Sequence, residues 1–134
     1  MGGMRVKALK TTTSVPLYFD LEKFQDLVFL KCCIDEIVEE DGHENDMYLG
    51  LTSVRDMDGF EVYAARMYIL GWESFRSWIL KVDLERIAKT ASKDYSLPRD
   101  AVMEFLTGMR GQLEDWQIFV DEESDSLDLE FWYN

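Results

Sequence analysis

The residues on which most catalytic and metal sites depend are scarce in this sequence, which holds one histidine and two cysteines among its 134 residues. Any mechanism that pairs a histidine with a serine or cysteine must therefore use His43. His43 lies in an acidic turn beside Gly42, where a solvated histidine is the ordinary situation. We therefore expect no enzyme activity and no catalytic residue.

The two cysteines, Cys32 and Cys33, are adjacent in the chain. Neighbouring residues on a strand point to opposite faces, so we expect no disulfide between them. There is no C-x-x-C pair and no second histidine, which leaves too few ligands for a zinc site. Free cysteines favour a reducing compartment, and we expect an intracellular, cytoplasmic protein.

Motifs for membranes, nucleotides and calcium are also missing. An apolar run such as Leu27–Leu30 is far shorter than the roughly 20 residues that cross a bilayer. The basic start of the chain leads into Thr11–Ser14 instead of an apolar stretch, so no signal peptide is expected. No glycine-rich phosphate loop occurs, and the acidic runs 39–46 and 56–59 do not match the spacing of an EF-hand loop. We therefore expect no metal ion and no cofactor.

The sequence does have enough apolar side chain for one core. Apolar residues make up 47% and aromatic residues 13% of the chain, well above the hydrophobic content of disordered chains. The length favours one domain. Residues 1–15 carry Arg5, Lys7 and Lys10 but no acid, and we expect a flexible basic arm there. The single folded domain is then expected over residues 16–134.

Alternation of apolar residues predicts most of the secondary structure as strands. Strands are predicted at 27–38, 47–54, 60–70 and 76–82, and a last hairpin at 116–120 and 127–133. A period near three and a half residues predicts two helices, one over 84–91 behind the N-cap Asp83 and one over 98–113. Residues 20–28 fit either a short helix or a lead into the first strand.

These elements predict the fold class α+β. We expect a mainly antiparallel sheet of about six strands, either open or curled into a sandwich or half barrel. A helix-turn-helix pair is inserted before the C-terminal hairpin. Hairpins predominate over βαβ units, which disfavours a parallel sheet.

The net charge is −13, which argues against direct binding to nucleic acid or to an anionic membrane and favours a basic protein partner. The excess of acidic over basic residues is concentrated in two segments. Residues 35–46 hold seven acids and residues 114–130 hold eight, with no lysine or arginine in either segment, whereas residues 55–110 balance nine acids against nine bases. Two predicted hairpins therefore carry most of the net charge.

We interpret the tips of these hairpins as the candidate surface for a basic protein partner. The candidate partner-binding residues are Glu39, Glu40, Asp41, His43, Glu44, Asp46, Asp121, Glu122, Glu123 and Asp125. The predicted function is that of a noncatalytic acidic protein-binding module. One such function is that of an immunity or inhibitor protein, which neutralises a basic toxin. Charged turns also keep proteins soluble and protect sheet edges, and this explanation accounts for the acids equally well.

The predicted layout over residues 27–134 resembles that of the head domains of DNA end-joining scaffold proteins and the related centriole assembly protein. The resemblance concerns the order of strands and helices and involves no shared motif. It implies a self-assembling scaffold domain, and with it a homodimer, as the alternative function. A small enzyme that uses carboxylates alone, or a carrier of a small ligand, is a third alternative.

Overall fold

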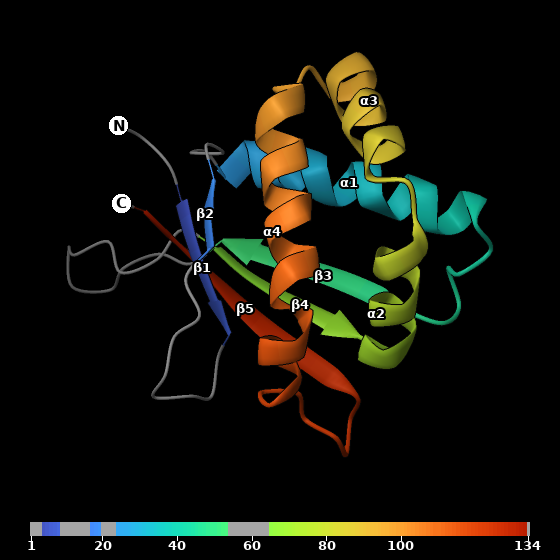
Figure 1. Ribbon diagram of the computed structural model, residues 1–134, viewed down its shortest axis with the longest axis vertical. Coiled ribbons are helices and arrows are strands. Elements are labelled where there is room, and N and C mark those ends of the chain that lie inside the picture. Colours follow the sequence, from blue (N-terminus) through green and yellow to red (C-terminus); the bar gives the residue numbers. More distant parts are fainter. Residues whose placement is uncertain (1–3, 9–16, 20–23, 54–64, 134) are drawn as a thin grey trace.

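The computed structural model describes residues 4–8, 17–19, 24–53 and 65–133, and every element named below lies within these ranges (Figure 1). The elements follow in the order β1 (Met4–Ala8), β2 (Leu17–Phe19), α1 (Phe24–Glu40), β3 (Tyr48–Ser53), β4 (Ala65–Leu70), α2 (Trp72–Lys81), α3 (Leu84–Tyr95), α4 (Arg99–Gln117) and β5 (Ser126–Tyr133). Residues 4–8 of the expected basic arm form β1, and the rest of the arm lies outside the described residues.

The strands form one antiparallel sheet in the order β2-β1-β5-β4-β3. The last strand of the chain, β5, lies in the middle of this sheet and pairs with β1 on one side and β4 on the other. β4 in turn pairs with β3, which is an edge strand of the described sheet. The central strand is thus the one that is added last along the chain.

The two faces of β3, β4 and β5 differ in burial. The inner face carries apolar side chains that are buried or partly buried, namely Leu49, Leu51, Ala65, Met67, Ile69, Leu127, Leu129 and Phe131. On the outer face, Tyr48 and Leu70 lie directly opposite each other and are both exposed. This alternation is the one expected of a sheet whose helices cover one side.

The helices cover the inner face with their apolar sides. α4 crosses the sheet (Figure 1), and its Phe105 ring lies 6.2 Å from the ring of Phe131 in β5. α3 packs against both α1 and α4. The side chain of Asp83 accepts a hydrogen bond from the N–H of Glu85 and so caps α3. The two helices predicted over 84–91 and 98–113, and this N-cap, are confirmed.

The predicted strand over 27–38 is wrong, because residues 24–40 form the helix α1. Leu27, Leu30, Ile34 and Ile37 are all buried. Their spacing of three or four residues places them on one side of a helix. Because Leu30 and Ile34 are also an even number of residues apart, the same side chains imitate the alternation of a strand.

The predicted strand over 76–82 is also helical, since most of it lies in α2. Phe75, Ile79 and Val82 are buried at the spacing of a helix face. The first arm of the predicted last hairpin, 116–120, is the end of α4 and the turn that follows it. Its second arm is confirmed as β5. The predicted strands over 47–54 and 60–70 correspond to β3 and β4, and residues 54 and 60–64 lie outside the described ranges.

The expectation of about six strands, curled or open, around one helix pair is therefore wrong. The described chain has four helices, with α1 before β3 and three helices between β4 and β5. The layout that resembles the scaffold head domains, four strands followed by two helices, is thus absent from the described ranges. Among the described residues, no helix combines the length and the apolar character needed to cross a bilayer.

Candidate functional site

The first acidic segment is a well-defined turn that ends α1. The N–H of His43 donates to the carbonyl oxygen of Val38 at 2.9 Å, and the N–H of Gly42 donates to that of Glu39 at 3.0 Å. Gly42 has a φ of 78°, the left-handed conformation that glycine supplies at helix C-termini. His43 Nδ1 then pairs with Asp46 Oδ2 at 2.9 Å. The turn follows a helix and is not the tip of a hairpin.

Two of its acids are engaged inside the protein. Arg86 of α3 donates to Asp41 Oδ1 at 2.9 Å and to Glu40 Oε2 at 2.6 Å. The indole Nε1 of Trp78 in α2 donates to Asp41 Oδ2 at 2.8 Å. These hydrogen bonds hold the pKa of Asp41 below its usual value, and the bond from Trp78 has a larger effect than the bond from Arg86. Glu40 and Asp41 therefore connect the end of α1 to α2 and α3.

The second acidic segment is the turn before β5. Asp121 and Ser126 exchange two backbone hydrogen bonds, which close the turn. The carbonyl oxygen of Asp125 accepts from the N–H groups of Gly71 and Trp72, each at 3.0 Å. Its Oδ1 accepts from the N–H of Glu73 at 3.2 Å. Asp125 thus accepts hydrogen bonds from three N–H groups at the start of α2, where a negative charge also suits the helix dipole.

The two acidic segments meet at Gly71, the residue that joins β4 to α2. Gly71 has a φ of 73°, and a Cβ built on it lies only 2.1 Å from the carbonyl oxygen of Asp46. Its N–H donates to the carbonyl oxygen of Asp125. Residues 41–46 and 121–126 therefore approach each other across one glycine, although they are about 80 residues apart in the sequence.

The ten predicted partner-binding residues fall into two groups. Glu40, Asp41, His43, Asp46, Asp121 and Asp125 form hydrogen bonds or ion pairs within the protein. The other four, Glu39, Glu44, Glu122 and Glu123, are exposed, and their carboxylates form no ion pair with the described residues. These four carboxylates are the ones available to a partner.

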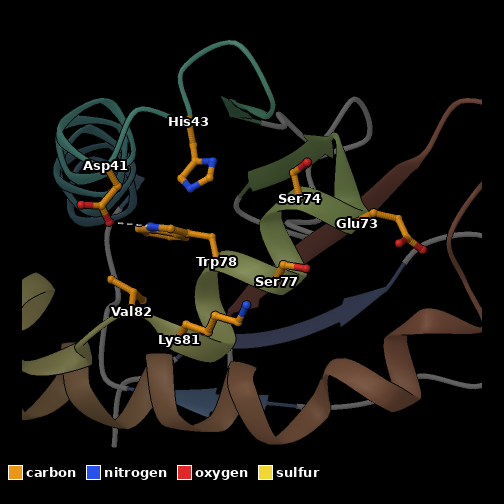
Figure 2. A pocket seen from close by; sticks show the side chains of 8 residues that line it. All are labelled: Asp41, His43, Glu73, Ser74, Ser77, Trp78, Lys81 and Val82. Carbon is orange, nitrogen blue, oxygen red and sulfur yellow. Dashed lines mark hydrogen bonds between the residues drawn. The ribbon is translucent and has the colours of Figure 1, made fainter.

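A pocket of about 430 Å³ lies between the first turn and α2. It is lined by Asp41, His43, Glu73, Ser74, Ser77, Trp78, Lys81 and Val82. Figure 2 shows the His43 ring directed toward α2 from the turn, with the Trp78 indole lying between α2 and Asp41.

The polar groups of this pocket are of mixed charge. The acids Asp41 and Glu73 lie in its wall together with the ammonium group of Lys81. Within the described residues, no hydrogen bond joins His43 to Ser74 or Ser77, and an activated serine nucleophile requires one.

The cysteines lie on α1, not on a strand. Cys33 is buried, and its Sγ donates to the carbonyl oxygen of Ile87 at 3.4 Å. Burial is the main cause that raises the pKa of the Cys33 thiol to about 12, and the nearby negative charge of Glu36 adds to it. No three His, Cys, Asp or Glu side chains of the described ranges are grouped so that they could hold a metal ion.

Sequence reasoning missed the basic and aromatic residues that fix the acids. Arg86 carried no signal, because a single arginine on an amphipathic helix is an ordinary surface residue. Trp78 was expected on a strand. Gly71 did carry a signal, since a lone glycine directly after an apolar strand marks a change of direction.

No protein-family model, no curated protein and no solved structure matches this chain.

Proposed function

We propose that this protein is a noncatalytic binding module that recognises a basic surface of another protein. The acidic surface that we assign to this role consists of Glu39, Glu44, Glu122 and Glu123. The observation that supports the proposal is the meeting of the two acidic segments at Gly71. Two acidic turns that lie far apart in the sequence thereby lie on either side of one residue.

The electrostatic properties of the acidic surface suit a basic partner. None of its four carboxylates is neutralised by a described lysine or arginine. The net charge of −13 attracts a basic protein over a distance of about 8 to 10 Å at ordinary salt concentrations. Such attraction raises the rate of association and disfavours partners of the same charge.

An inhibitor or immunity protein that neutralises a basic enzyme is a role that fits this surface. Enzymes that act on nucleic acids carry basic surfaces, and an acidic protein can occupy them in place of the substrate phosphates. Direct binding of this protein to nucleic acid is disfavoured by the same charge.

A homodimer stays a prediction, which light scattering over a range of concentrations tests.

The experiment compares two variants that lose the same net charge. In the first, Glu44→Gln, Glu122→Gln and Glu123→Gln remove charges from the acidic surface. In the second, the exposed Glu85, Asp94 and Glu104 are changed to Gln, Asn and Gln. Binding of a fluorescent poly-lysine is measured by anisotropy at low and at physiological salt.

We expect the surface variant to bind about tenfold more weakly, since three rim charges worth about 0.5 kcal/mol each give that factor. The control variant should lose much less. Equal losses in the two variants would mean that poly-lysine responds only to net charge, and would refute the proposed surface.

A further inference from the structure

Tyr48 is the most exposed aromatic residue described next to the acidic surface. It begins β3 directly after the first acidic turn, and 53% of it is exposed. Leu70, its partner across β3 and β4, is 42% exposed. Both side chains lie on the outer face at the end of the sheet that adjoins Gly71. An exposed aromatic and apolar pair with acids around it has the composition of a protein interface, with an apolar centre and a polar rim.

Two shallow hollows adjoin Tyr48. One, of about 180 Å³, is lined by Glu44, Asn45, Asp46, Met47, Tyr48, Leu70 and Gly71. The other, of about 190 Å³, is lined by Asp35, Val38, Glu39, Glu44, Met47 and Tyr48. Glu44, Met47 and Tyr48 belong to both, so the two hollows share one wall.

Each hollow combines an apolar wall with the available carboxylate of Glu44, and the other acids include Asp46, which is paired with His43. Glu44 and Asp46 lie in the first, where Leu70 supplies the apolar part, and Glu39 lies in the second beside Val38. No lysine or arginine of the described chain lines either of them. A long basic side chain places its aliphatic stem on apolar surface and its charged end near acids or water, which is what these hollows offer.

The larger pocket beside Trp78 is less suited to a cation. Its wall includes the ammonium group of Lys81, and Arg86 already binds the carboxylate of Asp41 there. A cation that enters this pocket meets a like charge in its wall. The lining of the first smaller hollow holds no cation, and at the second hollow the ammonium group of Lys31 pairs with Asp35 at 2.7 Å and leaves Glu39 and Glu44 without an ion pair among the described residues.

The ring of Tyr48 is already held in place. It lies 5.9 Å from the ring of Tyr68, and a hydrogen bond with Tyr48 raises the pKa of Tyr68. Tyr68 in turn lies over Gly50, where an added Cβ meets the tyrosine ring. The ammonium group of Lys31 lies 6.0 Å from the centre of the Tyr48 ring. These contacts restrict the ring, which reduces the conformational freedom that it loses when a partner binds. Lys31, which also pairs with Asp35 at 2.7 Å, shows that a cation fits beside the ring.

We propose that Tyr48 is the central contact of the docking surface for the basic partner, and that the two hollows beside it accept lysine or arginine side chains of that partner. This inference rests on the proposed function and makes it specific. The partner presents two basic side chains that lie on either side of an aromatic ring. Binding depends on the ring as well as on the acids.

The experiment uses a peptide that contains Arg-Ser-Arg between glycine and serine residues. The same peptide with lysines, and one with uncharged citrulline in place of arginine, serve as the other arms. Binding to the full chain is followed by two-dimensional NMR of the backbone amides. The variants are Tyr48→Ala, Tyr48→Phe and Ile118→Ala, the last being a control that removes exposed apolar surface elsewhere.

We expect saturable shifts at residues 44–48, 70 and 71 with the arginine or lysine peptide and none with the citrulline peptide. Tyr48→Ala should weaken binding at least about tenfold, as for a central aromatic contact. Tyr48→Phe should weaken it much less, and Ile118→Ala should have no effect.

The two proposals fail in different ways. If Tyr48→Ala binds the peptide as well as the original chain does, or if the shifts lie at residues 73–82, the docking surface proposed here is wrong while the acidic module stands. The docking surface is also wrong if poly-lysine binds through Glu44, Glu122 and Glu123 but the arginine and lysine peptides do not bind. If poly-lysine shows no preference for these acids either, the proposed function itself falls.

Discussion

The indole N–H of Trp78 donates a hydrogen bond of 2.8 Å to a carboxylate oxygen of Asp41, and thereby joins α2 to the turn that ends α1. The other oxygen of the same carboxylate accepts from Arg86. One acid of the predicted partner-binding set thus holds two helices to the end of a third.

The first prediction concerns the pH dependence of stability that Asp41 causes. Its pKa is lowered in the folded protein, so its ionised form stabilises the fold at pH values above the ordinary value of 3.8. This contribution is lost as the pH falls through the lower folded value. Urea unfolding should therefore show that Asp41→Asn is less stable than the original chain at neutral pH, and that the difference shrinks below about pH 4.

The control for this prediction is Glu104→Gln, which removes the same charge from an exposed position on α4. It should leave the pH dependence of unfolding almost unchanged. A difference between Asp41→Asn and the original chain that persists at pH values as low as about 2 would contradict the assignment to the ionised carboxylate.

The second prediction concerns Asp125, which caps α2 from another part of the chain. Asp125 has a φ of 50°, a conformation that asparagine adopts readily and alanine does not. Asp125→Asn keeps both the conformation and an oxygen for the N–H of Glu73, so we expect little loss of stability. Asp125→Ala should lower the free energy of unfolding by about 1 to 2 kcal/mol. Chemical unfolding of both variants measures this, and equal stability of the two would rule out the cap.

The third prediction compares two glycine-to-alanine changes. At Gly71 a Cβ meets the carbonyl oxygen of Asp46 at 2.1 Å, and the φ is positive. Gly71→Ala should therefore lower the free energy of unfolding by about 2 kcal/mol or more. At Gly111, inside α4, a Cβ meets no atom within 4 Å. Gly111→Ala should raise the free energy of unfolding by about 0.5 to 1 kcal/mol, and thermal unfolding should show a higher melting temperature.

The fourth prediction concerns the reactivity of the two thiols. Cys33 is buried and its thiol pKa is raised to about 12, whereas Cys32 is partly exposed. Iodoacetamide applied to the folded protein near pH 8 should modify Cys32 first, and Cys33 only after urea is added. Mass spectrometry of the peptides decides this. Modification of both at one rate in the folded state would show that α1 opens readily.

The regions where sequence and structure agree share one physical property, which is that only one period fits their residues. Leu84, Ile87, Ala88 and Ala91 fit a helix face and no strand, and all four are buried in α3. Leu127, Leu129 and Phe131 alternate along β5 and are buried on its inner face. The length of these patterns also makes the prediction easier, because the helical pattern continues for about two turns and the alternation in β5 includes three inward residues.

The errors arise where a short apolar pattern fits both periods. Leu30 and Ile34 lie four residues apart, which suits one side of a helix and one side of a strand alike. The aromatic and β-branched residues of α2 favour strands intrinsically, yet Phe75 and Ile79 are buried on a helix that the rest of the fold holds in place. Tertiary packing decides such segments, and a single sequence does not display it.

The acidic character of the candidate site could be predicted from the sequence, but its geometry could not. The sequence placed both acidic segments at hairpin tips without a reason for them to meet. Their approach depends on Gly71, which donates a hydrogen bond to one segment and lies in close contact with the other. The internal use of Asp41 depends on Arg86, about 45 residues away, and no local pattern reports a contact at that separation.

The central position of β5 has a consequence for synthesis on the ribosome. β5 is the only described strand that pairs with both β1 and β4, so the N-terminal strands and the β3–β4 pair remain unconnected until residues 126–133 have left the exit tunnel. Helix α2 likewise lacks its cap until Asp125 has been made. A nascent chain that stalls before this point exposes two separate sheet edges, so chaperone binding or aggregation is expected to be greatest just before the last strand emerges.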